Sequence, residues 1–166
     1  VHAAFSEWSD AIPVGAMGHS LGEFSALVAC GLMGFEDAVV TVRLRGKLMQ
    51  QAVPVGLGSM AAVFGLAAAD VEQALKKFSK ELVSIAAYNS PEQCVLTGNR
   101  HTVEAAASLL KQQGAKRVMP LQVSAPFHSY LMRPAEAPLR KHLETLTWGH
   151  ASFPVVSNVD AGRYQD

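Results

Sequence analysis

The sequence has few cysteines, few aromatic residues and no excess of charge of either sign. Its 14 basic and 14 acidic side chains cancel, whereas proteins that bind nucleic acid or an anionic membrane surface usually carry a basic excess. The longest apolar run, residues 60–69, is too short to span a bilayer. We therefore expect neither a nucleic acid nor a membrane among the partners of this protein.

The two cysteines and six histidines follow no redox or metal-ligand spacing. Cys30 and Cys94 have no C-x-x-C neighbour, so we expect buried, reduced thiols, as in a cytoplasmic protein. The histidines are scattered along the chain, which argues against a metal site. What the chain does have is a 49% share of hydrophobic residues, enough for the core of one domain or of one domain with a small insertion.

The chain is organised around the pentapeptide Gly18-His19-Ser20-Leu21-Gly22. The apolar residues 12–17 before it predict one buried strand, and residues 23–30 after it predict a helix that ends at Gly31. Strand, G-x-S-x-G and helix together indicate a nucleophile elbow, in which a strained serine is exposed and the two glycines leave room for it. The bare pattern also fits a glycine-rich turn, so the interpretation needs a base to act on Ser20.

Residues 35–53 predict a long amphipathic helix with an arginine on its apolar face. At 100° per residue, one narrow stripe holds Ala38, Val42, Arg45, Met49 and Ala52. A guanidinium in such a place normally has a partner, because burying it alone is unfavourable. Arg45 is therefore either part of a structural ion pair, or a side chain that extends to solvent, or an arginine kept for an anionic ligand.

The middle of the chain predicts a small lobe with the order β-α-β-β-α-β. The expected strands are 59–66, 82–88, 94–97 and 116–121, and the expected helices are 68–78 and 102–113. This order is typical of a ferredoxin-like unit. We predict an α/β fold in which residues 56–120 form this inserted lobe, while residues 1–55 and 121–166 form an α/β-hydrolase-like large lobe with a mostly parallel sheet.

Three further elements are expected outside the small lobe. Residues 1–8 read as the tail of a helix, and residues 151–158 read as a strand. A helix is expected near residues 134–146, and because proline interrupts a helix interior, it should start near Ala137 or bend at Pro138.

His128 is the histidine we predict to act as the base. It lies on a loop between elements, after Pro126 and Phe127, where positioned functional groups tend to occur. The weaker candidates are His2 near an end, His19 packed in the elbow, His101 opening a helix, His142 on a solvated face and His150 in a turn. Asp160 is the nearest acid in chain order, but hydrolase triads usually run serine, acid, histidine, so we assign no third member.

Four segments carry a resemblance to a known family. They are Gly18-His19-Ser20-Leu21-Gly22-Glu23, Arg45-Gly46-Lys47-Leu48-Met49-Gln50, Tyr88-Asn89-Ser90-Pro91 and Ser124-Ala125-Pro126-Phe127-His128-Ser129. In their order and spacing they resemble the malonyl-CoA:acyl carrier protein transacylases of bacterial fatty acid biosynthesis, which are related to the acyltransferase domains of polyketide synthases. The similarity runs nearly from end to end of the sequence.

The resemblance implies transfer of a malonyl group from coenzyme A to the thiol of acyl carrier protein through an ester on Ser20, without a metal or redox cofactor. His128 would act as base and acid, and an amide or main-chain oxygen would orient it. Arg45 would bind the malonyl carboxylate in a two-pronged salt bridge, and the Leu21 amide would donate to the oxyanion.

The resemblance also implies a substrate site that includes His19, Met49, Asn89 and Phe127. Phe127 is like members that accept malonyl, whereas members that take methylmalonyl often have serine there. Many members have asparagine where this chain has Ala87, so one polar contact is absent here.

The resemblance covers about the central half of such a domain. The family begins with a strand and a Gly-Gln-Gly segment that supplies a second oxyanion donor, and it continues past Asp166. From this we expect little turnover from the 166 residues alone, and we expect residues 56–120 to fold by themselves. Three alternatives stay open: an acyltransferase of a polyketide synthase, a serine esterase, and an inactive fragment that only binds carrier protein.

Overall fold

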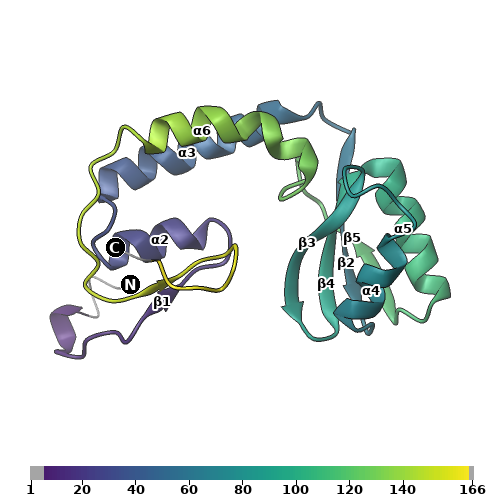
Figure 1. Ribbon diagram of the computed structural model, residues 1–166, viewed down its shortest axis with the longest axis horizontal. Coiled ribbons are helices and arrows are strands. Elements are labelled where there is room, and N and C mark those ends of the chain that lie inside the picture. Colours follow the sequence, from purple (N-terminus) through teal and green to yellow (C-terminus); the bar gives the residue numbers. More distant parts are fainter. Residues whose placement is uncertain (1–5, 165–166) are drawn as a thin grey trace. The chain divides into compact units, whose positions relative to one another are not determined.

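The computed structural model describes residues 6–164 and divides into two compact units (Figure 1). The first unit comprises the residues up to Leu44 and those from Lys141, and the second comprises Arg45–Arg140. Helices α3 (Phe35–Ala52) and α6 (Glu136–Leu143) each contain one of these boundaries. The lobe division at residues 55/56 and 120/121 stays a prediction. Of the helix expected over residues 1–8, residues 6–8 are helical and the rest lies outside the described residues.

The second unit contains a four-stranded antiparallel sheet with the strand order β3-β4-β2-β5. Its elements in chain order are β2 (Gly58–Phe64), α4 (Ala68–Leu75), β3 (Val83–Ser90), β4 (Gln93–Asn99), α5 (Arg100–Gln112) and β5 (Arg117–Pro120). Each strand and helix expected from the hydrophobic pattern is present, with ends shifted by a few residues. Helices α4 and α5 cover one face of the sheet (Figure 1).

The core of this unit lies between that face and the two helices. Alternate residues of a strand point to the same face, which is why Ala61 and Val63 of β2 and Cys94 and Leu96 of β4 are buried together. The helices and remaining strands add Val71, Ala74, Val83, Val103, Ala106, Leu110 and Val118. Burial also raises the pKa of the Cys94 thiol to about 11, so this cysteine is a packing residue.

The first unit contains a short parallel pair of strands, β1 (Ala16–Met17) and β6 (Val155–Val156). Of the strand expected over residues 12–17, only Ala16–Met17 forms, and the expectation that it is buried is wrong, because Ile12, Val14 and Met17 are 80%, 96% and 78% exposed. Pro13 and Pro154 have no amide hydrogen for a ladder. Pairing therefore begins where the Ala16 N–H donates to the Pro154 carbonyl at 2.8 Å.

Helix α2 (Gly22–Ala29) and the start of α3 pack beside this strand pair. Their shared core consists of Ala26, Leu27, Cys30, Met33, Ala38, Phe153 and Val155. The segment after α2 turns at Gly31, whose φ of 87° is in the left-handed region that glycine adopts without strain. Cys30 is a buried free thiol, as expected.

The proline-containing segment folds as a 3₁₀ helix, η1 (Tyr130–Ala135), followed by α6. Pro138 is the third residue of α6, where its missing N–H removes no intrahelical bond. The expected start of this helix near Ala137 is confirmed. Within residues 6–164, none of the helices has the length and hydropathy needed to cross a membrane.

Candidate active site

Ser20 stands in strained backbone geometry between a strand and a helix. Its φ is 53°, in the left-handed region that residues with a side chain usually avoid. It follows β1 and precedes Leu21, the N-cap of α2. Since such a conformation costs about 1–3 kcal/mol, the surrounding structure has to hold it. The strand–serine–helix turn predicted from the pentapeptide is therefore present.

The two glycines of the pentapeptide are not equivalent. A Cβ on Gly18 would overlap the carbonyl group of Gly22 and would lie 2.5 Å from the Glu23 nitrogen. A Cβ on Gly22 would meet nothing within 4 Å among the described residues, apart from its neighbours and its own helix. The expectation that both glycines leave room for the turn is right for Gly18 and wrong for Gly22, because only Gly18 faces another part of the backbone.

A matched pair of alanine substitutions tests this difference. Gly18→Ala should lower the free energy of unfolding by about 1–3 kcal/mol, since a backbone clash has to be relieved. Gly22→Ala should change it by less than about 1 kcal/mol, and toward greater stability, because alanine favours a helix start over glycine. Urea unfolding of both variants measures the difference, and equal losses would contradict this account of Gly18.

The Leu21 amide, predicted to donate to an oxyanion, follows Ser20 at the start of α2. The next amides are used locally: Gly22 N–H donates to His19 at 3.0 Å, and Glu23 N–H donates to Ser20 at 3.3 Å. Among residues 6–164, the Leu21 N–H makes no such bond. It lies at the N-terminus of α2, where the helix dipole favours negative charge.

Asn158 and Glu23 hold this turn, and the sequence analysis did not identify either role. The Asn158 side chain accepts from the Ser20 N–H at 2.8 Å and donates to the Gly18 carbonyl at 2.6 Å. Glu23 Oε1 accepts from the Asn158 N–H at 3.0 Å and from the Tyr164 hydroxyl at 2.6 Å. Burial and the bond to Glu23 raise the pKa of Tyr164 to about 12.

His128 lies on a loop that is fixed on both sides. Its own φ is 60°, a second left-handed residue with a side chain, and its ring is exposed. Pro126 before it is fully buried against Gly58, where a Cβ would overlap the proline ring. Thr97 of β4 donates to the Phe127 carbonyl at 2.7 Å, and Ser129 donates to the Pro126 carbonyl at 2.7 Å. The backbone around His128 is therefore held in one strained conformation.

Arg45 is half-buried on α3, while Arg43 and Lys47 are exposed, as the stripe predicts. Met49, one turn further along the stripe, is buried in a cluster with Val53, Ala125, Met132 and Ala135, and Phe127 packs against this cluster. The helix that carries Arg45 and the loop that carries His128 thus share one core in the second unit.

Two expectations about histidines are wrong. His19 is exposed and does not pack in the elbow. The core of the first unit forms from residues of α2, the start of α3 and the segment 153–155, and His19 is not among them. His142 is half-buried and not on a solvated face, because its Nε2 lies 2.9 Å from the hydroxyl of the fully buried Thr41.

The predicted site residues are divided between the two units. His19, Ser20 and Leu21 belong to the first, and Arg45, Met49, Asn89, Phe127 and His128 belong to the second. Within the second unit, Met49 and Phe127 pack in one cluster, whereas Asn89 is exposed at the end of β3. Residues 6–164 contain no group of three or more His, Cys, Asp or Glu residues suited to a metal ion.

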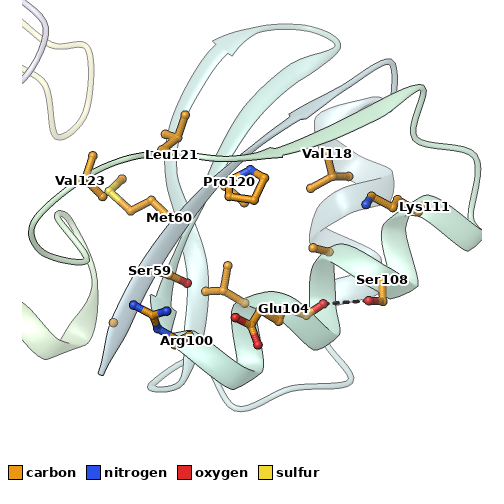
Figure 2. A pocket seen from close by; sticks show the side chains of 14 residues that line it. Ser59, Met60, Arg100, Glu104, Ser108, Lys111, Val118, Pro120, Leu121 and Val123 are labelled. Atoms are coloured by element: carbon orange, nitrogen blue, oxygen red, sulfur yellow. Dashed lines mark hydrogen bonds between the residues drawn. The ribbon is translucent and has the colours of Figure 1, made fainter. Parts of the chain in front are cut away.

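Each unit also has a cavity of its own. A cavity of about 650 Å³ in the first unit is lined mostly by apolar side chains, together with Glu23, His150 and Tyr164. A cavity of about 350 Å³ in the second unit lies between α5 and strands β2 and β5, and Arg100, Glu104 and Lys111 border it (Figure 2). None of the eight site residues named above lines either cavity.

Comparison with known proteins gives consistent relatives. A Bacillus subtilis malonyl CoA-acyl carrier protein transacylase is 50% identical over 146 residues, covering 87% of this chain and 46% of that protein. Its Staphylococcus aureus counterpart is 48% identical over 147 residues, covering 87% and 48%. The chain thus spans about half the length of the curated relatives it matches.

The solved structures that resemble this chain are also malonyl transferases. An acyl carrier protein S-malonyltransferase from Vibrio cholerae matches with a TM-score of 0.95 and 42% identity, covering 99% of this chain and 54% of that one. A malonyl-transacylase solved with its type II polyketide synthase acyl-carrier protein matches with a TM-score of 0.95 and 43% identity, covering 99% and 54%.

The family profile described as the acyl transferase domain matches residues 10–163. That range holds all eight predicted site residues, among them Ser20 and His128, which have a left-handed φ. The chain belongs to the acyl transferase domain family.

Proposed function

We propose that the protein transfers a malonyl group from coenzyme A to the thiol of acyl carrier protein through an ester on Ser20. The observation that carries the proposal is the geometry of Ser20, a serine with a φ of 53° directly before the N-cap of α2. Such a turn presents a hydroxyl beside a free helix amide, which is the arrangement acyl transfer requires. The malonyl transacylases among the relatives favour malonyl as the acyl group.

In the first step, Ser20 Oγ attacks the thioester carbonyl of malonyl-CoA. His128 takes the hydroxyl proton, and the oxyanion of the tetrahedral intermediate accepts from the Leu21 N–H. When the intermediate collapses, the carbon–sulfur bond breaks and the sulfur receives the proton from His128. Coenzyme A leaves as a thiol, and the malonyl group remains as a serine ester.

The second step is the reverse exchange with a new thiol. The carrier protein thiol gives its proton to His128 and attacks the ester carbonyl, and Ser20 Oγ leaves with that proton. Every step is an attack on a carbonyl carbon, so the proposed reaction uses no metal ion and no redox cofactor.

Arg45 is proposed to bind the free carboxylate of the malonyl group. A guanidinium matches a carboxylate in two parallel hydrogen bonds, and a half-buried position strengthens such a pair. Phe127, His19 and Asn89 are proposed to border the acyl and thiol portions. Met49 is proposed to support Arg45 from one turn away, because it is buried in the shared core.

We further propose that the two-lobe architecture of the prediction applies. Strand order β3-β4-β2-β5 with two helices on one face supports a ferredoxin-like lobe over residues 56–120. The parallel pair of β1 and β6, with the elbow directly after β1, supports an α/β-hydrolase-like large lobe. The buried free thiols of Cys30 and Cys94 support a reducing compartment such as the cytoplasm.

Radiolabelled malonyl-CoA tests the proposed function. The protein should retain label as a covalent acyl-enzyme and release it to acyl carrier protein when that thiol is added. A serine esterase would instead release free malonate in the absence of any thiol, and that result would overturn the proposal. Carrier proteins from fatty acid and polyketide systems, assayed in parallel, would identify the pathway.

A further inference from the structure

We propose that Asn158 is a positioning residue for the nucleophile, holding Ser20 and the Leu21 amide in the geometry that acyl transfer requires. The inference rests on the proposed function of Ser20. Asn158 lies 138 residues from Ser20 in sequence, yet its side chain bonds to the backbone on both sides of His19.

The two bonds reproduce the pattern of a parallel sheet. In β1 and β6, Ala16 lies opposite Val155 and Met17 lies opposite Val156. Extending that register places His19 opposite Asn158, and a parallel partner opposite His19 would bond to the Gly18 carbonyl and the Ser20 N–H. The side-chain amide of Asn158 makes those two bonds in place of a backbone, with lengths of 2.6 Å and 2.8 Å.

The backbone N–H of Asn158 bonds to another residue, which explains why the side chain makes the bonds to Gly18 and Ser20. Its N–H donates to Glu23 Oε1 at 3.0 Å, and Glu23 lies in the first turn of α2. The Tyr164 hydroxyl donates to the same oxygen at 2.6 Å. One turn of the chain, residues 158–164, therefore holds both the end of the elbow strand and the start of the elbow helix.

That turn is itself closed by hydrogen bonds, so Asn158 is held in place. Ser157 N–H donates to the Gly162 carbonyl at 2.8 Å, and Ala161 N–H donates to the Ser157 carbonyl at 3.1 Å. Gly162 N–H donates to the Asp160 carboxylate at 2.9 Å. A hydrogen-bonded turn that presents one amide to the elbow is suited to positioning, because it holds the backbone on both sides of His19 and so fixes the strained Ser20.

The two backbone groups need a side chain that both donates and accepts a hydrogen bond. The Gly18 carbonyl needs a donor and the Ser20 N–H needs an acceptor, and a primary amide supplies both at once. The peptide that ends in the Ser20 nitrogen sets the φ of Ser20, and the next peptide carries the Leu21 N–H. Without Asn158, Ser20 can relax from its left-handed conformation, and both Oγ and the oxyanion donor shift.

The first test compares Asn158→Ala with the wild type and with Val159→Ala, a neighbour that is 94% exposed. The rate of Ser20 acylation at saturating malonyl-CoA should fall about 10- to 100-fold in Asn158→Ala, as expected for a displaced nucleophile and oxyanion donor. The half-saturating malonyl-CoA concentration should stay within about twofold, because the Asn158 side chain uses its oxygen and its nitrogen on the backbone of Ser20 and Gly18. Val159→Ala should match the wild type in both.

The second test uses Asn158→Asp and pH. A protonated aspartic acid has a donor and an acceptor, as asparagine has, whereas an aspartate has no donor for the Gly18 carbonyl. Glu23, whose Oε1 accepts from the N–H of residue 158, places a second carboxyl group near the introduced one, and two neighbouring carboxyl groups favour the neutral form of one of them. Hydrogen bonds from the Gly162 backbone and Ser157 hold the pKa of Asp160 below its ordinary value, and Tyr164 stays neutral with a pKa of about 12. The acylation rate of Asn158→Asp relative to the wild type should therefore rise as the pH falls.

A serine-directed fluorophosphonate provides a readout that does not depend on malonyl-CoA. If wild-type Ser20 reacts with this probe and not with malonyl-CoA, the proposed function fails while the effect of Asn158 is still measured. Unchanged reaction of Asn158→Ala with both reagents would overturn the inference. If thermal unfolding shows that Asn158→Ala does not fold, the test rests on Asn158→Asp. An acylation rate of Asn158→Asp relative to the wild type that does not change with pH would then overturn the inference.

Discussion

Replacing His128 with alanine should slow both steps of malonyl transfer by about two to four orders of magnitude, the usual contribution of a positioned acid–base group. The backbone around His128 is fixed by the buried Pro126 and by the bond from Thr97, so the loss is chemical and not structural. Quenched-flow measurement of acyl-enzyme formation from malonyl-CoA, and then of its decay after carrier protein is added, gives the rate of each step separately.

His101→Ala is the matched control, because this histidine is exposed on α5 in the same unit. It should leave both rates unchanged. A normal transfer rate in His128→Ala would show that another group acts as the base.

Replacing Arg45 with alanine should weaken malonyl transfer by about 2–5 kcal/mol in transition-state binding, because the malonyl carboxylate would lose its bidentate partner. Acetyl transfer should suffer far less or even improve, since an acetyl group has no carboxylate to leave unpaired. The ratio of kcat/KM values for malonyl-CoA and acetyl-CoA measures this change in specificity.

Two further variants refine the test of Arg45. Arg45→Lys keeps the charge and loses the planar fork, so it should recover only part of the malonyl rate. Arg43→Ala, an exposed position on the same helix, should leave the ratio of the two substrates unchanged. An equal loss for malonyl and acetyl in Arg45→Ala would make Arg45 a structural ion-pair residue, the alternative left open by the sequence.

The elbow could be predicted because its signals are local. Gly18, Ser20 and the helix after them follow one another in sequence, and the strained φ of Ser20 follows from that order. The same is true of the four strands and two helices of the second unit, where hydrophobic periodicity decides the element type. The ends of these helices and strands depend on single side chains and are harder to predict. Helix α5 begins at Arg100 and not at residue 102, because the Asn99 side chain caps it by accepting from the N–H groups of His101 and Thr102.

The parts that sequence reasoning missed depend on long-range pairing. The role of Asn158 arises only when β6 lies parallel to β1, and nothing near residue 158 indicates that partner. The charged neighbours of His142 predict a solvated face, yet its hydrogen-bond partner Thr41 lies 101 residues away in sequence. The exposure of Ile12 and Val14 was missed because an apolar run alone does not show whether a neighbouring strand covers it.

The most direct test of the central claim is the site of acylation. Brief exposure of the protein to malonyl-CoA, followed by digestion and peptide mass spectrometry, should place one malonyl group on Ser20, and Ser20→Ala should carry none. A malonyl group on another residue, or equal labelling of the wild type and Ser20→Ala, would contradict the account of Ser20 as the nucleophile.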